Sequence, residues 1–158
     1  MLTASPNYDE KVASDHKRMA RDRFYSQVKA ALIKAGWTIT HDPLKLEIGG
    51  VKLEVDFGAE VLADGVLAAE RDAEKIAVEV KSFISSSPTN ELHAALGQFI
   101  AYRLALSELE PDRHLYLAIP LAAYADFFQR PFPKRLVQEN GLSLMVYDPI
   151  RQEVLQWL

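Results

Sequence analysis

The stretch IAVEVKSF, residues 76–83, decides the fold of this 158-residue chain. It is an apolar strand pattern that an acid and a base interrupt at alternate positions. Successive side chains of a strand point to opposite faces, so we expect Glu79 and Lys81 on one face and Val78 and Val80 on the other. A carboxylate on a buried strand is costly unless it is paired, hydrogen-bonded or bound to a metal. The stretch predicts a functional site on a central strand, or else a solvated strand face.

The E-x-K triplet by itself is common, so it is weak evidence for function. An upstream acid at a strand end strengthens the functional interpretation. The stretch VKLEVDFG, residues 51–58, delivers Asp56 just before a glycine that permits a bend or bulge. Asp56 and Glu79 can then converge, and converging carboxylates repel unless a cation lies between them. We expect Mg²⁺ or Mn²⁺, because Mg²⁺ takes one or two carboxylates together with water and phosphate oxygens. With Lys81 orienting or deprotonating a water, the predicted reaction is phosphodiester hydrolysis.

The remaining pattern alternates helices and short strands. Helical spacing runs over residues 21–35, 92–106 and 121–138, the last interrupted by two prolines. Strand signals lie at 37–39, 44–48, 51–57, 66–70, 76–83, 114–119, 142–147 and 154–158. Gly49-Gly50 predicts a hairpin turn, and the strands at 66–70 and 76–83 should pair antiparallel. These elements predict an α/β (α+β) fold with one mixed central sheet flanked by helices. We expect residues 1–18 to be a flexible extension and 19–158 a single domain.

Composition limits the class of protein. Hydrophobic residues make up 49% and charged residues 25%, and there is no cysteine, so disulfides and cysteine-ligated metals are excluded. The sequence has no segment long and apolar enough to cross a membrane, and a cytoplasmic location is expected. The net charge of -4 argues against binding nucleic acid by bulk electrostatics, although a local basic rim would suffice.

Several runs resemble the XisH family, known as fdxN element excision controlling factors. They are DFGAE (56–60), AAER (68–71), IAVEVKSF (76–83), ALGQFIAYR (95–103), LYLAIP (115–120), VYDP (146–149) and QWL (156–158). The resemblance implies a PD-(D/E)xK restriction-endonuclease-like core, in which Asp56 matches the first acid and Glu79 and Lys81 match the E-x-K half. Gln98 and Tyr102 resemble the Q-x-x-x-Y of RecB-like nucleases, one turn apart on one helix face.

Two functions follow from the resemblance. The first is a metal-dependent DNA endonuclease, or nuclease subunit, in which Asp56 and Glu79 bind metal, Lys81 assists the water and Gln98 positions it. The alternative is a non-catalytic accessory factor that acts on a site-specific recombinase through a XisI-type partner. The intact motif favours chemistry, whereas the acidic charge favours work through a partner. A homodimer is compatible with either, and family members tend to begin near Met19.

Other acids are secondary candidates for the site. Glu70 would be an extra acid if residues 66–70 pair with the central strand, although a cross-strand pair with Lys75 is the simpler interpretation. Asp64 would compete with Asp56 in a simple hairpin register. Asp22 and Glu60 are candidate outer ligands, although a helix cap is the favoured interpretation for Asp22.

Lone histidines and clustered aromatics have plainer interpretations. His93 and His114 have no partner motif, and we expect structural roles for both. The cluster of Tyr124, Phe127, Phe128 and Phe132 predicts core or a partner interface rather than a base-stacking platform, because it lacks interleaved basic residues.

Overall fold

One mixed sheet of six strands organises the molecule, with strand order β1-β4-β5-β6-β7-β8. The computed structural model describes residues 23–61 and 74–158. The sheet contains β1 (Thr38–His41), β4 (Phe57–Val61), β5 (Glu74–Val80), β6 (Arg113–Pro120), β7 (Leu144–Asp148) and β8 (Glu153–Trp157), and a separate ribbon pairs β2 (Leu44–Ile48) with β3 (Val51–Val55). β5, β6 and β7 are parallel, and the other neighbours are antiparallel. The predicted mixed sheet is confirmed.

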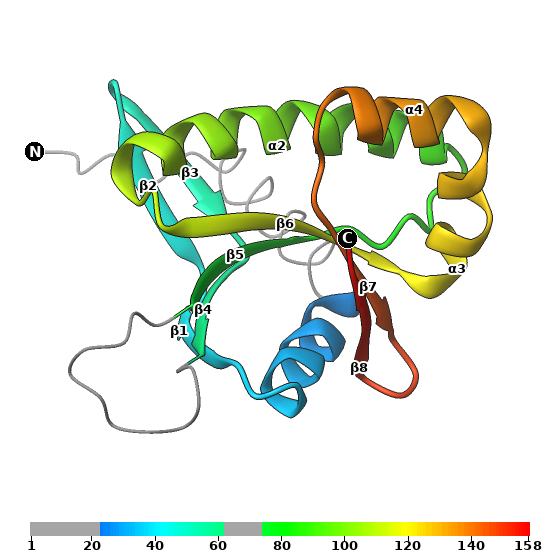
Figure 1. Cartoon of the computed structure of the whole chain (residues 1–158), viewed down its shortest axis with the longest axis horizontal. Helices are drawn as coiled ribbons and strands as arrows, with labels where there is room; N and C mark the ends of the chain where they lie inside the picture. Colours follow the sequence, from blue (N-terminus) through cyan, green and yellow to red (C-terminus); the bar gives the residue numbers. More distant parts are fainter. Residues whose placement is uncertain (1–22, 62–73) are drawn as a thin grey trace, which may run out of the picture.

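Helices cover both faces of this sheet (Figure 1). Residues 23–34 are helical and lie on one face, where Val28 and Leu32 pack against Phe57 and Val78. The long helix α2 (Pro88–Leu109) lies on the other face, over the ribbon and the central strands. A short helix α3 (Leu121–Ala125), a 3₁₀ turn η2 (Phe127–Gln129) and α4 (Pro131–Glu139) follow β6. Because both faces are covered, β5 is buried along most of its length, as its nearly continuous apolar sequence indicates.

The start of α2 follows from local sequence. The Ser87 hydroxyl accepts a hydrogen bond from the Asn90 N–H at 3.3 Å, and Pro88 occupies the first turn, where its missing N–H costs nothing. The face toward the sheet carries the buried residues Leu92, Ala95, Phe99, Tyr102, Ala105 and Leu106. No helix within residues 23–61 and 74–158 combines the length and apolarity needed to span a bilayer.

The chain bends at Asp56, and the sequence did not predict that the residues on its two sides join different sheets. We expected one strand over 51–57, but β3 ends at Val55 and β4 begins at Phe57 in a different sheet. Gly58 leaves room for neighbouring side chains just after the bend: a Cβ there would lie 2.9 Å from His41 Nδ1 and 3.1 Å from His41 Cβ, so a larger residue would have to displace His41.

The strand next to β5 also differs from the prediction. β5 pairs with β4 along one edge and with β6 along the other. Over these paired residues, neither edge of β5 is open for the predicted hairpin with residues 66–70. Those residues themselves lie outside the described part of the chain. β8 closes the sheet as the expected edge strand.

Candidate functional site

Two buried acids flank the point where β4 meets the end of β5. Asp56 immediately precedes β4, whose first residue Phe57 pairs with Val78, and Glu79 follows Val78 on β5. Both side chains are buried: Asp56 is 1% exposed and Glu79 is 7% exposed. That the two acids converge on one cation stays a prediction.

The Asp56 carboxylate is fixed by the strand that carries Glu79. Its Oδ2 atom accepts a hydrogen bond of 2.9 Å from the backbone N–H of Val80. This hydrogen bond ties the bend at Asp56 to the last residue of β5. The position of the Asp56 carboxylate therefore depends on a backbone donor next to Glu79.

Lys81 lies one residue beyond β5, and its backbone is held on both sides. Its N–H donates to the Ala118 carbonyl at 3.0 Å, and its own carbonyl accepts from the Tyr147 hydroxyl at 3.2 Å. Tyr147 is fully buried, and this burial raises the pKa of its phenol well above the ordinary value. The sequence analysis missed Tyr147 as a supporting residue; its only signal was a phenol within an otherwise apolar strand, since a buried hydroxyl needs a partner.

The two predicted helix residues lie on the buried side of α2. Tyr102 is part of the core between α2 and the sheet. Gln98 is half-buried, and its Oε1 atom is covered but accepts no hydrogen bond from any residue that the structure describes. Because Gln98 lies between Ala95 and Tyr102 at helical spacing, its amide is on the same side of α2 as the sheet.

The secondary acids divide into two groups. Glu60 is opposite Lys75 at the far end of β4 and lies 3.6 Å from the Arg113 guanidinium, so the structure does not bring it to Asp56. Glu70, Asp64 and Asp22 fall outside the described residues.

The acid pair suits a hard cation with few protein ligands. Within residues 23–61 and 74–158, no cluster of three or more His, Cys, Asp or Glu side chains has the arrangement of a metal site. Mg²⁺ is commonly held by only one or two carboxylates, and water and phosphate complete its shell. Two buried carboxylates on adjacent strands fit that donor set.

A mostly apolar cavity of about 300 Å³ opens directly beyond Lys81. Its walls come from the carboxyl ends of the parallel strands and the helix 23–34. The lining residues are Phe24, Ser82, Phe83, Ile84, Pro120, Leu121, Ala122, Ala123, Asp148, Pro149 and Ile150. The carboxyl end of a parallel sheet is where open α/β folds place their ligands.

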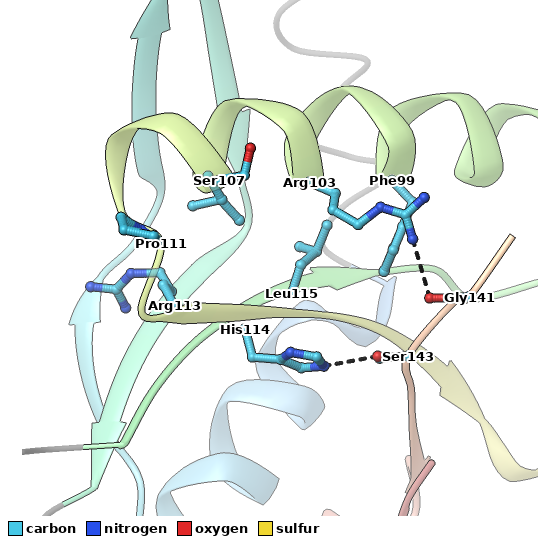
Figure 2. Close-up of a pocket in the computed structure, with 10 residues that line it drawn as sticks. Phe99, Arg103, Ser107, Pro111, Arg113, His114, Leu115, Gly141 and Ser143 are labelled. Atoms are coloured by element: carbon cyan, nitrogen blue, oxygen red, sulfur yellow. Dashed lines mark hydrogen bonds between the residues drawn. The ribbon is translucent and has the colours of Figure 1, made fainter.

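A second cavity of about 170 Å³ lies at the opposite end of β6 (Figure 2). There Arg103 donates to the Gly141 carbonyl at 3.2 Å, and a ring nitrogen of His114 lies 2.8 Å from the Ser143 hydroxyl. These contacts join α2 and β6 to the start of β7. The predicted structural role of His114 agrees with this contact.

Comparison with known proteins then identifies the family. The XisH protein family model matches residues 19–155. The chain belongs to the XisH family. A solved XisH family protein from Nostoc punctiforme PCC 73102 is 48% identical and has a TM-score of 0.76; the match covers 87% of this chain and 99% of that one. A solved fdxN element excision controlling factor protein from Anabaena variabilis is 49% identical, with a TM-score of 0.76 and coverage of 87% and 98%.

No curated protein gives a significant match to this XisH chain. The family assignment therefore depends on the family model and the two solved XisH structures, which agree on nearly the same extent of sequence.

Proposed function

We propose that this XisH protein is a metal-dependent DNA endonuclease, or an endonuclease-like subunit, that acts in or controls the site-specific excision of a DNA element. The observation that supports the proposal is that the buried Asp56 carboxylate accepts a hydrogen bond of 2.9 Å from the Val80 N–H, one residue after the buried Glu79 and one before Lys81. The relative from Anabaena variabilis is described as an fdxN element excision controlling factor, which supplies the excision context. The proposed site corresponds to a PD-(D/E)xK core.

Asp56 and Glu79 would hold Mg²⁺ or Mn²⁺. When bound, such an ion lowers the pKa of a coordinated water and offsets negative charge at the phosphate. Asp56 is prepared for this role because the Val80 N–H holds its carboxylate in place at 2.9 Å.

Lys81 would hold the attacking water and take up or share its proton. The backbone hydrogen bonds from Lys81 to Ala118 and from Tyr147 restrict where its ammonium can reach. Gln98 would orient the same water or a phosphate oxygen from α2, because its covered Oε1 atom accepts no bond from the described residues. Together these groups would act on the phosphodiester bonds of DNA.

Calorimetric titration with Mn²⁺ tests the acid pair. We expect the wild-type protein to bind the ion, Glu79→Gln and Asp56→Asn to lose binding, and Glu47→Gln to keep it. Glu47 is the matched control because it is an exposed strand glutamate on the separate ribbon. Equal binding by wild type and Glu79→Gln would remove the metal site from the proposal.

A cleavage assay tests the chemistry. Duplex, branched and single-stranded DNA are incubated with Mg²⁺ or Mn²⁺, with and without a XisI-type partner, using wild type, Lys81→Ala and the control Lys45→Ala. We expect the loss of one water-activating group to slow cleavage by about 10² or more. Equal cleavage by Lys81→Ala would indicate a contaminating nuclease.

The second candidate function is a non-catalytic factor that works on a recombinase through a XisI-type partner. The net charge of -4 favours it, because such a protein need not hold DNA by itself. Absence of metal binding in the wild-type protein, combined with an effect on recombinase activity when the partner is added, would select this function.

A further inference from the structure

A basic segment with an exposed aromatic ring lies outside the acid site. We define the basic segment as residues 130–135, RPFPKR, which span the end of η2 and the start of α4. Within residues 23–61 and 74–158 it is the only six-residue stretch with three cations and no acid. On a chain with a net charge of -4, this makes it a local positive surface, and a local field can attract a polyanion to an acidic protein.

The cations of the basic segment are exposed and can exchange their carboxylate partners for a phosphate. Arg130 and Arg135 lie 3.4 Å and 3.5 Å from Asp126 and Glu139, and all four side chains are more than half exposed. Exposed pairs of this kind contribute little to stability and are readily replaced by a phosphate. Lys134 is exposed and forms no ion pair with any described residue.

Phe132 differs from the other phenylalanines of its aromatic cluster, which was expected to be core or a partner interface. Phe127 and Phe128 are buried in the core, whereas Phe132 is 64% exposed and is therefore not part of the core. A single exposed aromatic ring is ordinary on a protein surface. An exposed ring set among arginines and a lysine is the combination that stacks a base while cations contact the flanking phosphates.

The basic segment is also connected to the acid site by aromatic contacts. The Arg130 guanidinium lies 5.8 Å from the centre of the Phe127 ring, and the rings of Phe127 and Phe128 lie 6.1 Å and 5.0 Å from that of Phe83. Phe83 follows Lys81 by two residues and has φ = 49°, a backbone conformation that bulky residues rarely adopt. These ring contacts hold Phe83 there, so the basic segment keeps a defined position relative to the end of β5.

We propose that the basic segment binds an unpaired DNA strand and leads it to the acid pair. Phe132 stacks on a base, and Arg130 and Lys134 contact phosphates on either side of it. The proposal rests on the proposed function for the identity of the nucleic acid, and it names the single-stranded form as what the surface recognises. Duplex DNA offers no exposed base face, so it should bind more weakly.

Binding is measured in EDTA, so that the result does not depend on metal or cleavage. The probe is a single-stranded oligonucleotide with 2-aminopurine, whose fluorescence falls when it stacks, and anisotropy gives the affinity. The variants are Phe132→Ala, Phe132→Leu, Phe132→Tyr and Lys134→Glu. The control is Lys52→Glu, which makes the same charge change at an exposed lysine of the ribbon.

We expect Phe132→Ala and Phe132→Leu to weaken binding by about 5-fold or more and to lose the quenching, and Phe132→Tyr to retain both. Lys134→Glu should weaken binding more than Lys52→Glu and reduce the salt slope by about 0.7 for the lost phosphate contact. Because EDTA removes free metal from the assay, a failure of metal binding at the acid site would leave this result intact.

Three outcomes would overturn the proposal. Equal weakening by Lys134→Glu and Lys52→Glu would mean that only net charge matters. Unchanged quenching in Phe132→Ala would remove the stacking role. Binding to vesicles containing phosphatidylserine that depends on Phe132, without binding to the oligonucleotide, would assign the surface to a membrane instead.

Discussion

At the scale of single residues, Tyr147 is the least obvious contributor to the site. Its hydroxyl is buried beside the Lys81 carbonyl, and it is far in sequence from the residues it supports. A buried hydroxyl that makes one hydrogen bond typically contributes about 1 kcal/mol to stability. Tyr147 therefore affects both the free energy of unfolding and the position of Lys81.

The first prediction concerns Tyr147→Phe and alkaline pH. Burial raises the phenol's pKa, so above the unfolded-state value of about 10 the unfolded chain loses a proton that the folded chain keeps. The stability that the protonated Tyr147 phenol contributes is thus fully present below about pH 10 and falls as the pH rises beyond that value. We expect the free energy of unfolding of Tyr147→Phe to be about 1 kcal/mol below that of wild type at neutral pH. Between pH 10 and 11 it should fall less than that of wild type, as measured by urea unfolding.

Part of the alkaline loss should survive in Tyr147→Phe. Burial and the charge of Glu74 also raise the pKa of Tyr116, which keeps titrating in the variant. An unchanged slope above pH 10 would mean that Tyr147 does not carry the effect.

Arg113 is a second residue whose role is decided by distant partners. Its side chain is buried, donates to the Ile76 carbonyl at 2.9 Å and lies 3.3 Å from Glu110 and 3.6 Å from Glu60. We predict that Arg113→Met lowers the free energy of unfolding by about 2 kcal/mol or more, because strand carbonyls and two acids lose their cation. In chemical denaturation, the exposed pair of Arg135 gives the control: Arg135→Met should cost less than about 1 kcal/mol.

At the scale of elements, α2 positions Gln98 and Tyr102 as one rigid unit. Its first turn depends on the cap from Ser87 to Asn90. We predict that Ser87→Ala destabilises the protein by about 1 kcal/mol, and that Ser87→Asp restores most of it because aspartate also caps and favours the positive end of the helix. Thermal unfolding measures both, and equal loss in the two variants would mean that the cap is not what Ser87 contributes.

Elements with local signals were predictable, and those that depend on distant partners were not. The helices, β6, β7 and β8 follow from periodicity and from capping or breaking residues within one window. The bend at Asp56 did not, because Val51, Leu53, Val55 and Phe57 alternate without interruption across it. Which sheet each half joins is set by pairing with strands elsewhere in the chain.

The burial of the two acids was predictable to a similar degree, because Glu79 interrupts an apolar strand and Asp56 follows another. Their role as a metal site stays a prediction. The environment of Arg113 was not predictable, since its carbonyl partners Ile76 and Ala59 are 37 and 54 positions away in sequence. The sequence left Phe132 open between core and a partner interface, because it did not show that Pro131 starts a new helix in which Phe132 is exposed while Phe127 and Phe128 are buried.

At the scale of the whole molecule, metal binding should appear as added stability. An ion that binds only the folded state stabilises it by about 2.7 kcal/mol at a hundred times its dissociation constant. We predict that Mn²⁺ raises the unfolding temperature of wild type and of Glu47→Gln but not of Glu79→Gln. Differential scanning calorimetry with and without EDTA checks this, and an equal rise in all three would indicate binding elsewhere.

The two ends of β5 have different surroundings. One end is next to Arg113, opposite Lys75, and the other carries Glu79, about 13 Å away along the strand. Substitutions that far apart usually combine within about 0.5 kcal/mol of the sum of their separate effects. An engineer can therefore reinforce the Arg113 end to tolerate heat and, in the same protein, alter the side chains at the acidic end, with little trade-off between the two aims.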